Sequence, residues 1–410
     1  MRMLLSLAWK NLLRHRRRTL VTAVAIATGL AMYIWVDTWL QGVSLHSEQN
    51  LVNYQTGSYV IMHPRSWQQR KQLSLKHGLA DAASIIAALQ AAGWTASARI
   101  SFAAEAFFAE GSLPIRMVGI DPSQDARVFA LRQTVTSGRY LRGDEAGIMI
   151  GKTAADNLHA VVGDTLSLRC RTRHGSLQTL DLQIVGILNT PNPAVNGTCG
   201  FAPLDLVSEA LDMEAAVTEI AVKDRYWRQA DQRIQTIASL LRARFPELEV
   251  HSWKDQARGF LAALRIGTAR SSVFLLIVMI IAAVGISNTM ILAVSERGRE
   301  IATMRALGMD SLSIRLAFLL EAGGIGLVGA AAGIAMGAVL ALWITRWGVD
   351  MSPLIGNGDI GFPISGVFRG AWHPINTVYA LAFGIVSSLL FSILPVSRAL
   401  KRDIPECLQQ

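Results

Sequence analysis

Three patterns of residues in this 410-residue chain could carry chemistry, and none of them completes a catalytic site. The stretch G-I-M-I-G-K-T at 147–153 approaches a phosphate-binding loop, which needs four residues between its glycines. Only three residues separate Gly147 from Gly151, so a strand that turns into a helix is the better interpretation. The eight histidines are scattered, and no His, Cys, Asp or Glu residues have metal-site spacing. We therefore expect a protein that is not itself an enzyme and that binds no metal or cofactor.

Two acidic residues lie within apolar runs, where an ionisable group is a functional candidate. Asp37 follows Thr19 by about 27 Å along a helix. It would therefore lie near the far end of its run, where water can solvate it. Glu321 is less than two helical turns beyond Arg315 and can pair with Arg315 or Arg305. Solvation or pairing is the simpler interpretation of both acids, and a proton relay is the weaker one.

The elements that must position these residues are mainly apolar. Hydrophobic residues make up 51% of the chain and charged residues 17%, against about 25% charged in soluble proteins. A transmembrane helix needs about 20 mostly apolar residues. Four runs satisfy this, at 19–40, 273–294, 316–344 and 376–394. The sequence thus predicts an α-helical membrane protein with four transmembrane helices and excludes a disordered chain.

The basic residues indicate the orientation of the chain. The segments 1–18, 295–315 and 397–410 hold thirteen basic and five acidic residues, which is +8 of the total net charge of +9. Lys and Arg gather on the cytoplasmic side of membrane proteins, so both termini are expected there and nucleic-acid binding is not. The expected order is an amphipathic helix (1–18), transmembrane helices at 19–42, 271–294, 316–345 and 376–396, a large outer domain (43–270), a cytoplasmic coupling loop (295–315), a short outer loop (346–375) and a cytoplasmic tail (397–410).

The outer segment has the pattern of a mixed α/β domain. Strand-helix units at both ends enclose a β-rich middle, which predicts two subdomains, one inserted in the other. Strands are expected at 59–62, 115–120, 148–150, 165–169, 180–188, 217–222 and 248–250, and helices at 81–92 and 226–245.

Two of the three cysteines, Cys170 and Cys199, fall in this outer domain, where disulfides persist. A bridge between them would close a loop of about 30 residues and add about 3 kcal/mol of stability. It requires α-carbons within about 7 Å of each other. Both a disulfide and two free thiols therefore remain open at this stage.

The third apolar run carries small residues at a regular spacing. Gly329, Gly333 and Gly337 are four residues apart, so they share one face of a helix. Such a face lets another helix backbone approach closely. We expect tight helix packing there.

The loop E-R-G-R-E-I-A-T-M-R-A-L-G at 296–308 predicts a short amphipathic helix between two spans. Oppositely charged residues three apart can pair on its surface, and Gly308 fits a C-terminal cap. Its apolar stripe has no obvious core to face, which favours docking of a partner protein over a solvated turn. The residues expected to contact that partner are Glu296, Arg297, Arg299, Glu300, Ile301, Met304, Arg305, Leu307 and Gly308.

This loop, followed by F-L-L-E-A at 318–322, resembles the signature of the FtsX/MacB/LolC–LolE superfamily of ABC-transporter permeases. The N-terminal L-A-W-K-N-L-L-R-H-R-R-R-T and the closing L-P-V-S-R-A-L-K-R-D-I-P-E-C-L are similar to the ends of those permeases. In the outer domain, V-G-I-D-P, S-G-R-Y-L and V-V-G-D-T resemble the lipoprotein-releasing branch.

The resemblance implies a multi-pass permease in the bacterial inner membrane that dimerises with a second copy or a paralogue. A separate LolD-like or MacB-like ATPase subunit would bind ATP and Mg and dock on the coupling loop. Three functions follow: lipoprotein release with a periplasmic carrier, MacB-like export of peptides, toxins or drugs with a membrane-fusion protein, and FtsX-like regulation of wall hydrolases.

The resemblance further implies a lateral apolar cavity where the first two spans face each other across the dimer. The expected lining residues are Met32, Tyr33, Val36, Trp39, Leu40, Phe274, Ile277, Val278 and Ile281.

Overall fold

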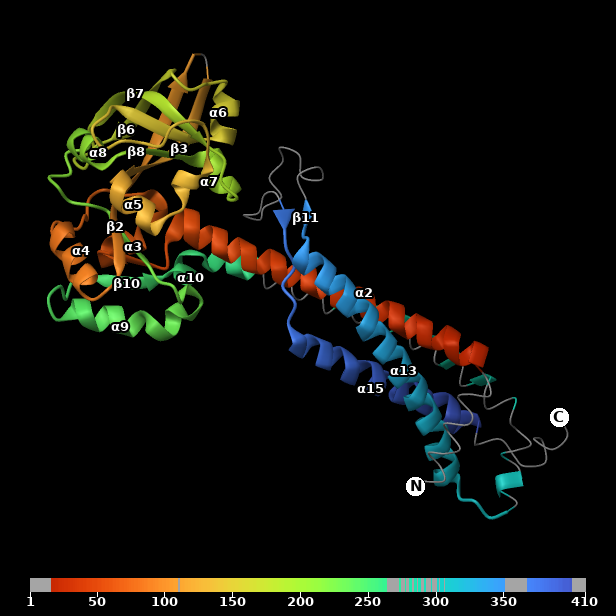
Figure 1. Ribbon diagram of the computed structural model, residues 1–410. Coiled ribbons are helices and arrows are strands. Elements are labelled where there is room, and N and C mark those ends of the chain that lie inside the picture. The colour runs from red at the N-terminus through yellow and green to blue at the C-terminus, as the bar shows by residue number, and fades with distance from the viewer. Residues whose placement is uncertain are drawn as a thin grey trace. The chain divides into compact units, whose positions relative to one another are not determined.

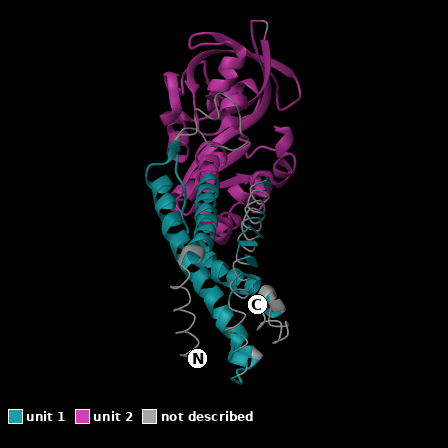
Figure 2. Cartoon of the chain, turned by 90° about the vertical axis from the view of Figure 1, so that its right-hand side faces the viewer, with its two compact units in different colours: residues 1–44, 263–349, 368–410 teal, residues 45–262, 350–367 magenta. Residues whose placement is uncertain are grey.

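The computed structural model describes residues 16–109, 111–263, 307–350 and 367–399, together with single residues between 273 and 305. The chain divides into two compact units (Figure 2). The helical unit contains 1–44, 263–349 and 368–410, and the α/β unit contains 45–262 and 350–367.

Three long helices dominate the helical unit (Figure 1). They are α2 (Arg16–Leu51), α13 (Ser311–Arg346) and α15 (Pro374–Ala399). Three stretches are long and apolar enough to cross a membrane: Thr19–Thr56, which is most of α2 with the turn that follows it, Leu312–Arg346 in α13 and Pro374–Ile393 in α15. The fourth expected span, 271–294, lies mostly outside the described residues, and its described members are helical. A two-stranded sheet joins β11 (Val349–Asp350) to β12 (Val367–Phe368) between α13 and α15.

The first part of the α/β unit is an antiparallel sheet in a split β-α-β arrangement. Its order is β10-β1-β9-β2, and α4 and α9 connect its strands. The bounds are β1 (Tyr59–Met62), α4 (Ala82–Ala91), β2 (Thr95–Phe108), β9 (Glu219–Lys223), α9 (Ala230–Arg242) and β10 (Glu249–Ser252). Apolar side chains of both helices pack on the sheet in one core with Tyr59 and Ile61.

The second part is a closed six-stranded barrel that shares β2 with this sheet. Around the ring, β2 pairs with β3, β3 with β8, β8 with β5, β5 with β7, β7 with β6, and β6 returns to β2. The strands are β3 (Gly111–Ile120), β5 (Gly147–Gly151), β6 (Thr165–Arg171), β7 (Leu177–Leu188) and β8 (Cys199–Pro203), with β4 (Val135–Gly138) added to β7. Because the ring is closed, each of its six strands has a hydrogen-bonded neighbour on both sides.

Short helices surround the barrel and the ends of the sheet. They are α3 (Pro64–Gln68), α5 (Pro122–Val128), α6 (Lys152–Leu158), α7 (Pro193–Thr198), α8 (Leu204–Ala210) and α10 (Trp253–Gln256). Single turns occupy η1 (Val52–Thr56), η2 (Arg70–Gln72), η3 (Leu131–Thr134) and η4 (Trp227–Gln229). The stretch that approaches a phosphate-binding loop is strand β5 followed by helix α6.

The order of the elements along the chain places one part inside the other. The chain leaves the antiparallel sheet through β2, builds the barrel between 109 and 218, and returns through β9, which pairs with the first half of β2. The segment 45–262 is therefore a large α/β unit in which the middle of its sequence forms the barrel. Strands β2, β4 and β8 were not expected from the sequence, and β3, β5, β6 and β7 overlap the expected ranges.

Candidate functional site

The glycine face of α13 lies against α2. A Cβ added at Gly333 would come 2.8 Å from the carbonyl oxygen of Ala27, and one at Gly337 would come 2.9 Å from Cβ of Ile34. Gly329 is equally close to Ile26, at 2.9 Å. No side chain larger than hydrogen fits at these distances, so the two helix backbones can approach only because these positions are glycine.

Helix α13 also packs on α15, along a different set of small residues. A Cβ at Gly326 would come 2.5 Å from Cβ of Ser388, and the Ser388 hydroxyl donates to the carbonyl oxygen of Ala322 at 2.6 Å. Gly384 of α15 faces Leu30 of α2. The three helices thus form one bundle with a shared core around Ile26, Leu30 and Ala330.

Asp37 joins α2 to α15. Its carboxylate accepts a hydrogen bond from Nδ2 of Asn376 at 2.7 Å. At the next residue of α2, the carbonyl oxygen of Thr38 accepts a hydrogen bond from the backbone N–H of Ala371, just before α15, at 3.0 Å. These contacts give Asp37 a role in holding two helices together, in line with its half-buried position.

The residues expected to line the substrate cavity differ in their exposure, and only some of them are accessible. Met32, Ile277 and Ile281 are exposed along the helical unit. Tyr33 instead packs against the three-helix core, and Trp39 makes an edge contact with Phe368, with ring centroids 6.0 Å apart. Val36 and Leu40 are partly buried. Phe274 and Val278 lie outside the described residues.

The coupling segment, 296–308, ends in the expected glycine cap, but part of its apolar stripe is buried within the protein. Gly308 has φ of 88°, and the N–H groups of Gly308 and Met309 donate to the carbonyls of Arg305 and Met304, which is the hydrogen-bond pattern of a glycine cap. Ile301 is buried with Ile314, Phe318 and Val396, and Met304 packs beside them. The expectation that the whole stripe faces a partner is therefore wrong for Ile301, because the ends of α13 and α15 cover it.

Leu307 remains as the exposed apolar residue of the stripe, with 83% of its surface accessible. Glu296 and Arg305 are described and have interactions within the chain. Arg297, Arg299 and Glu300 lie outside the described residues.

Of the two possibilities for Cys170 and Cys199, a disulfide or two free thiols, the structure has the free thiols. Both side chains are buried. Cys170 lies on β6 and Cys199 on β8, which stand opposite each other in the ring, with two strands between them in either direction. Adjacent strands are about 4.8 Å apart, so the strands do not bring the α-carbons to bridging distance. The two sulfurs also belong to different core clusters.

Burial disfavours the charged form of both thiols and raises the pKa of each above its ordinary value. Among the residues that the structure describes, no three side chains of His, Cys, Asp or Glu gather closely enough to hold a metal ion.

Comparison with known families covers both units. The chain matches the family model of the MacB-like periplasmic core domain over residues 19–237 and that of the FtsX-like permease C-terminal domain over 272–404.

Individual relatives agree with these families. The chain is 21% identical to an uncharacterized ABC transporter permease of Methanocaldococcus jannaschii, over 88% of this chain and 89% of that protein. It is 23% identical to the lipoprotein-releasing protein LolC of Neisseria meningitidis and to the macrolide export protein MacB of Neisseria gonorrhoeae. The aligned parts cover 57% and 83% of this chain, and 57% of LolC and 53% of MacB.

Since one family model covers more than half of the chain and the other covers most of the rest, the chain belongs to the MacB/FtsX superfamily of ABC-transporter permeases.

Proposed function

We propose that this permease works with a separate ATPase subunit and uses ATP-driven movement of its outer domain to extract or release lipoproteins from the bacterial inner membrane. The ATPase would dock on the segment 296–308, where Leu307 is exposed beside a glycine cap. ATP and Mg would bind to that partner. A second permease copy or a paralogue would complete the dimer.

One observation carries the choice of substrate: apolar side chains are exposed on α2 and on the described part of the second apolar run. Met32 is 43% exposed, and Ile277 and Ile281 are 50% and 65% exposed. Flexible methionine and branched side chains can repack around acyl chains of different lengths. Burial of an acyl chain contributes about 0.8 kcal/mol per CH₂, so such a surface can hold a lipid anchor without charged contacts.

The relatives LolC and LolE support this substrate class, since both are named as transmembrane proteins of lipoprotein-releasing systems. The second candidate is MacB-like export of peptides, toxins or drugs. It is favoured by the match to the MacB-like periplasmic core model and by an alignment with MacB that extends over 360 residues. FtsX-like control of wall hydrolases is the weakest of the three, because we expect a much smaller outer domain for that role than an α/β unit built from 45–262.

Photocrosslinking separates the two leading candidates. A photoreactive amino acid replaces Met32 or Ile281 in the full chain, and crosslinking is carried out in isolated membranes without nucleotide. The control position is Leu340 of α13, which is 40% exposed and thus matches Met32 in accessibility. We expect acylated proteins to be captured at Met32 and Ile281 and not at Leu340.

Capture of a soluble peptide or toxin by the outer domain, with no acylated protein at Met32 or Ile281, would replace lipoprotein release with the export function. Equal labelling of lipid at all three positions would mean that Met32 and Ile281 simply face the bilayer, and it would contradict the cavity.

A further inference from the structure

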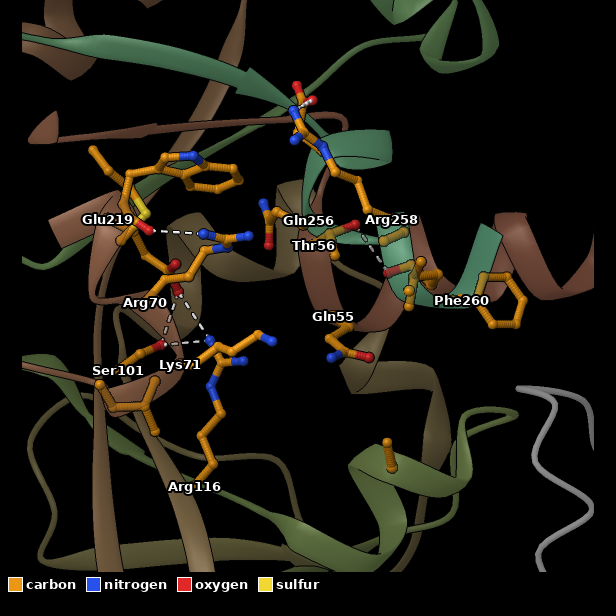
Figure 3. Close-up of a pocket in the computed structure, with 18 of the residues that line it drawn as sticks. Gln55, Thr56, Arg70, Lys71, Ser101, Arg116, Glu219, Gln256, Arg258 and Phe260 are labelled. Carbon is orange, nitrogen blue, oxygen red and sulfur yellow. Dashed lines mark hydrogen bonds and ion pairs between the residues drawn. The ribbon is translucent and has the colours of Figure 1, made fainter. Parts of the chain in front are cut away.

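A cavity of about 680 Å³ lies within the α/β unit and is used by none of the functions discussed so far. One wall is formed by the turn that follows α2, another by α3 and η2, and a third by the sheet where the barrel begins. The segment after α10 closes the fourth side. Figure 3 shows Arg70, Lys71 and Arg116 extending into this cavity, with Gln55, Thr56 and Gln256 on another side of it.

The side chains that line the cavity carry more positive than negative charges. Four cations and two carboxylates line the cavity. Glu219 is matched by Arg116 at 3.5 Å and by the Ser101 hydroxyl at 2.8 Å. Asp255 is matched by Arg258 at 2.7 Å.

The remaining two cations, Arg70 and Lys71, have no acidic partner in the described part of the chain. Arg70 is held in place by its own neighbours, because its guanidinium lies over the Trp67 ring at 4.1 Å and donates to the Trp67 carbonyl at 2.9 Å. The cavity therefore has an excess of positive charge, and one of the two cations is already positioned.

Two buried hydrogen-bond donors of the lining also have no acceptor. They are Nε of Arg116 and Nε2 of Gln256. A buried donor without an acceptor costs free energy, and such groups in a native protein usually have a water or a ligand as partner. Both unmatched groups are donors, so the missing partner is rich in acceptors.

We propose that this cavity binds a phosphate group carried by a small amphiphile. A phosphate offers several acceptor oxygens to cations that approach from different sides, which suits Arg70, Lys71 and Arg116. The apolar part of the ligand would lie against Leu51, Met62 and Phe260, which line the same cavity. The site would act in the same way whether the permease releases lipoproteins or exports other substrates.

The test is isothermal titration of the full-length chain in an uncharged detergent, without the ATPase. The two probes are dihexanoylphosphatidic acid and inorganic phosphate. We expect saturable binding of the phosphatidic acid, and an affinity about 10- to 100-fold lower in the Arg70→Gln/Lys71→Gln variant, which loses two charge-assisted contacts. Lys152→Gln is the matched control, since Lys152 is exposed on α6 and does not line the cavity. Its affinity should stay within about twofold of the unmodified chain, because screened surface charges contribute little.

Binding of both probes would assign the site to phosphate itself, and binding of the phosphatidic acid alone would assign it to a lipid headgroup. The proposal is wrong if neither probe binds saturably, or if Lys152→Gln weakens binding as much as the cavity variant does. Circular dichroism of each variant shows whether the fold is kept, and none of these results depends on transport by the permease.

Discussion

Arg99 and Asp125 form a buried ion pair that fixes α5 on the sheet of the α/β unit. Two hydrogen bonds of 2.7 and 3.0 Å join the guanidinium to both carboxylate oxygens, and the side chains are 3% and 0% exposed. The guanidinium also lies over the Phe129 ring at 3.3 Å. Removal of one partner from such a pair leaves the other charge buried and unmatched.

Asp125→Ala should therefore lower the free energy of unfolding by about 3–5 kcal/mol, measured by urea unfolding of the detergent-solubilised chain. The double variant Arg99→Met/Asp125→Leu removes both charges and should recover much of that loss. If Asp125→Ala were as stable as the double variant, the pair would not be what holds α5.

The buried thiols lead to a second expectation at the level of single residues. Under native, non-reducing conditions Cys170 and Cys199 should react with iodoacetamide only after denaturation, and mass spectrometry should find both unbridged. The raised pKa values also make stability depend on pH. Because the folded thiols hold their protons more tightly than unfolded ones, the free energy of unfolding should fall as the pH rises above about 8.5, the ordinary value for a thiol. A disulfide-linked peptide from the native chain would contradict the ring arrangement of β6 and β8.

Among the elements, the coupling segment offers a matched pair of substitutions. Leu307→Asp changes an exposed side chain and should alter the free energy of unfolding by no more than about 0.5 kcal/mol, while releasing the ATPase during co-purification. Ile301→Asp buries a carboxylate among Ile314, Phe318 and Val396 and should reduce the yield of folded permease. Full recovery of the ATPase with well-folded Leu307→Asp would show that the partner docks elsewhere.

The sequence predicts a strand or helix well where only one of its faces is buried, because buried and exposed residues then recur at a regular spacing. Strand β6 is an example, since its buried and exposed residues alternate and its position was expected. The longest strand, β2, was not expected, because residues 96–102 of it are buried on both faces and its small residues show no alternation in sequence. In the coupling segment the cap at Gly308 could be predicted from local chemistry. The burial of Ile301 could not, because it depends on contacts with residues of α13 and α15 that are distant in sequence.

For the whole molecule, the distribution of basic residues predicts the orientation in the membrane. Thirteen of the Lys and Arg residues lie in the segments 1–18, 295–315 and 397–410. A green fluorescent protein fused after residue 410 should fluoresce, which requires a cytoplasmic C-terminus. Alkaline phosphatase inserted at residue 175, in the turn between β6 and β7, should be active, which requires the opposite side. Activity of an alkaline phosphatase fused after residue 410 in place of the fluorescent protein would overturn the four-span topology.

The continuous strand β2 has a mechanical consequence for an ATP-driven machine. Its first half belongs to the antiparallel sheet through β9, and its second half closes the barrel through β6. Ten consecutive residues of β2 pair with β3. The hydrogen bonds between β2 and its neighbours run perpendicular to the strand. A force along β2 would therefore act on all of these bonds at once, in shear. A ladder loaded in this way resists sliding far better than one opened from its end, so the sheet and the barrel should travel under tension as a single rigid lever arm.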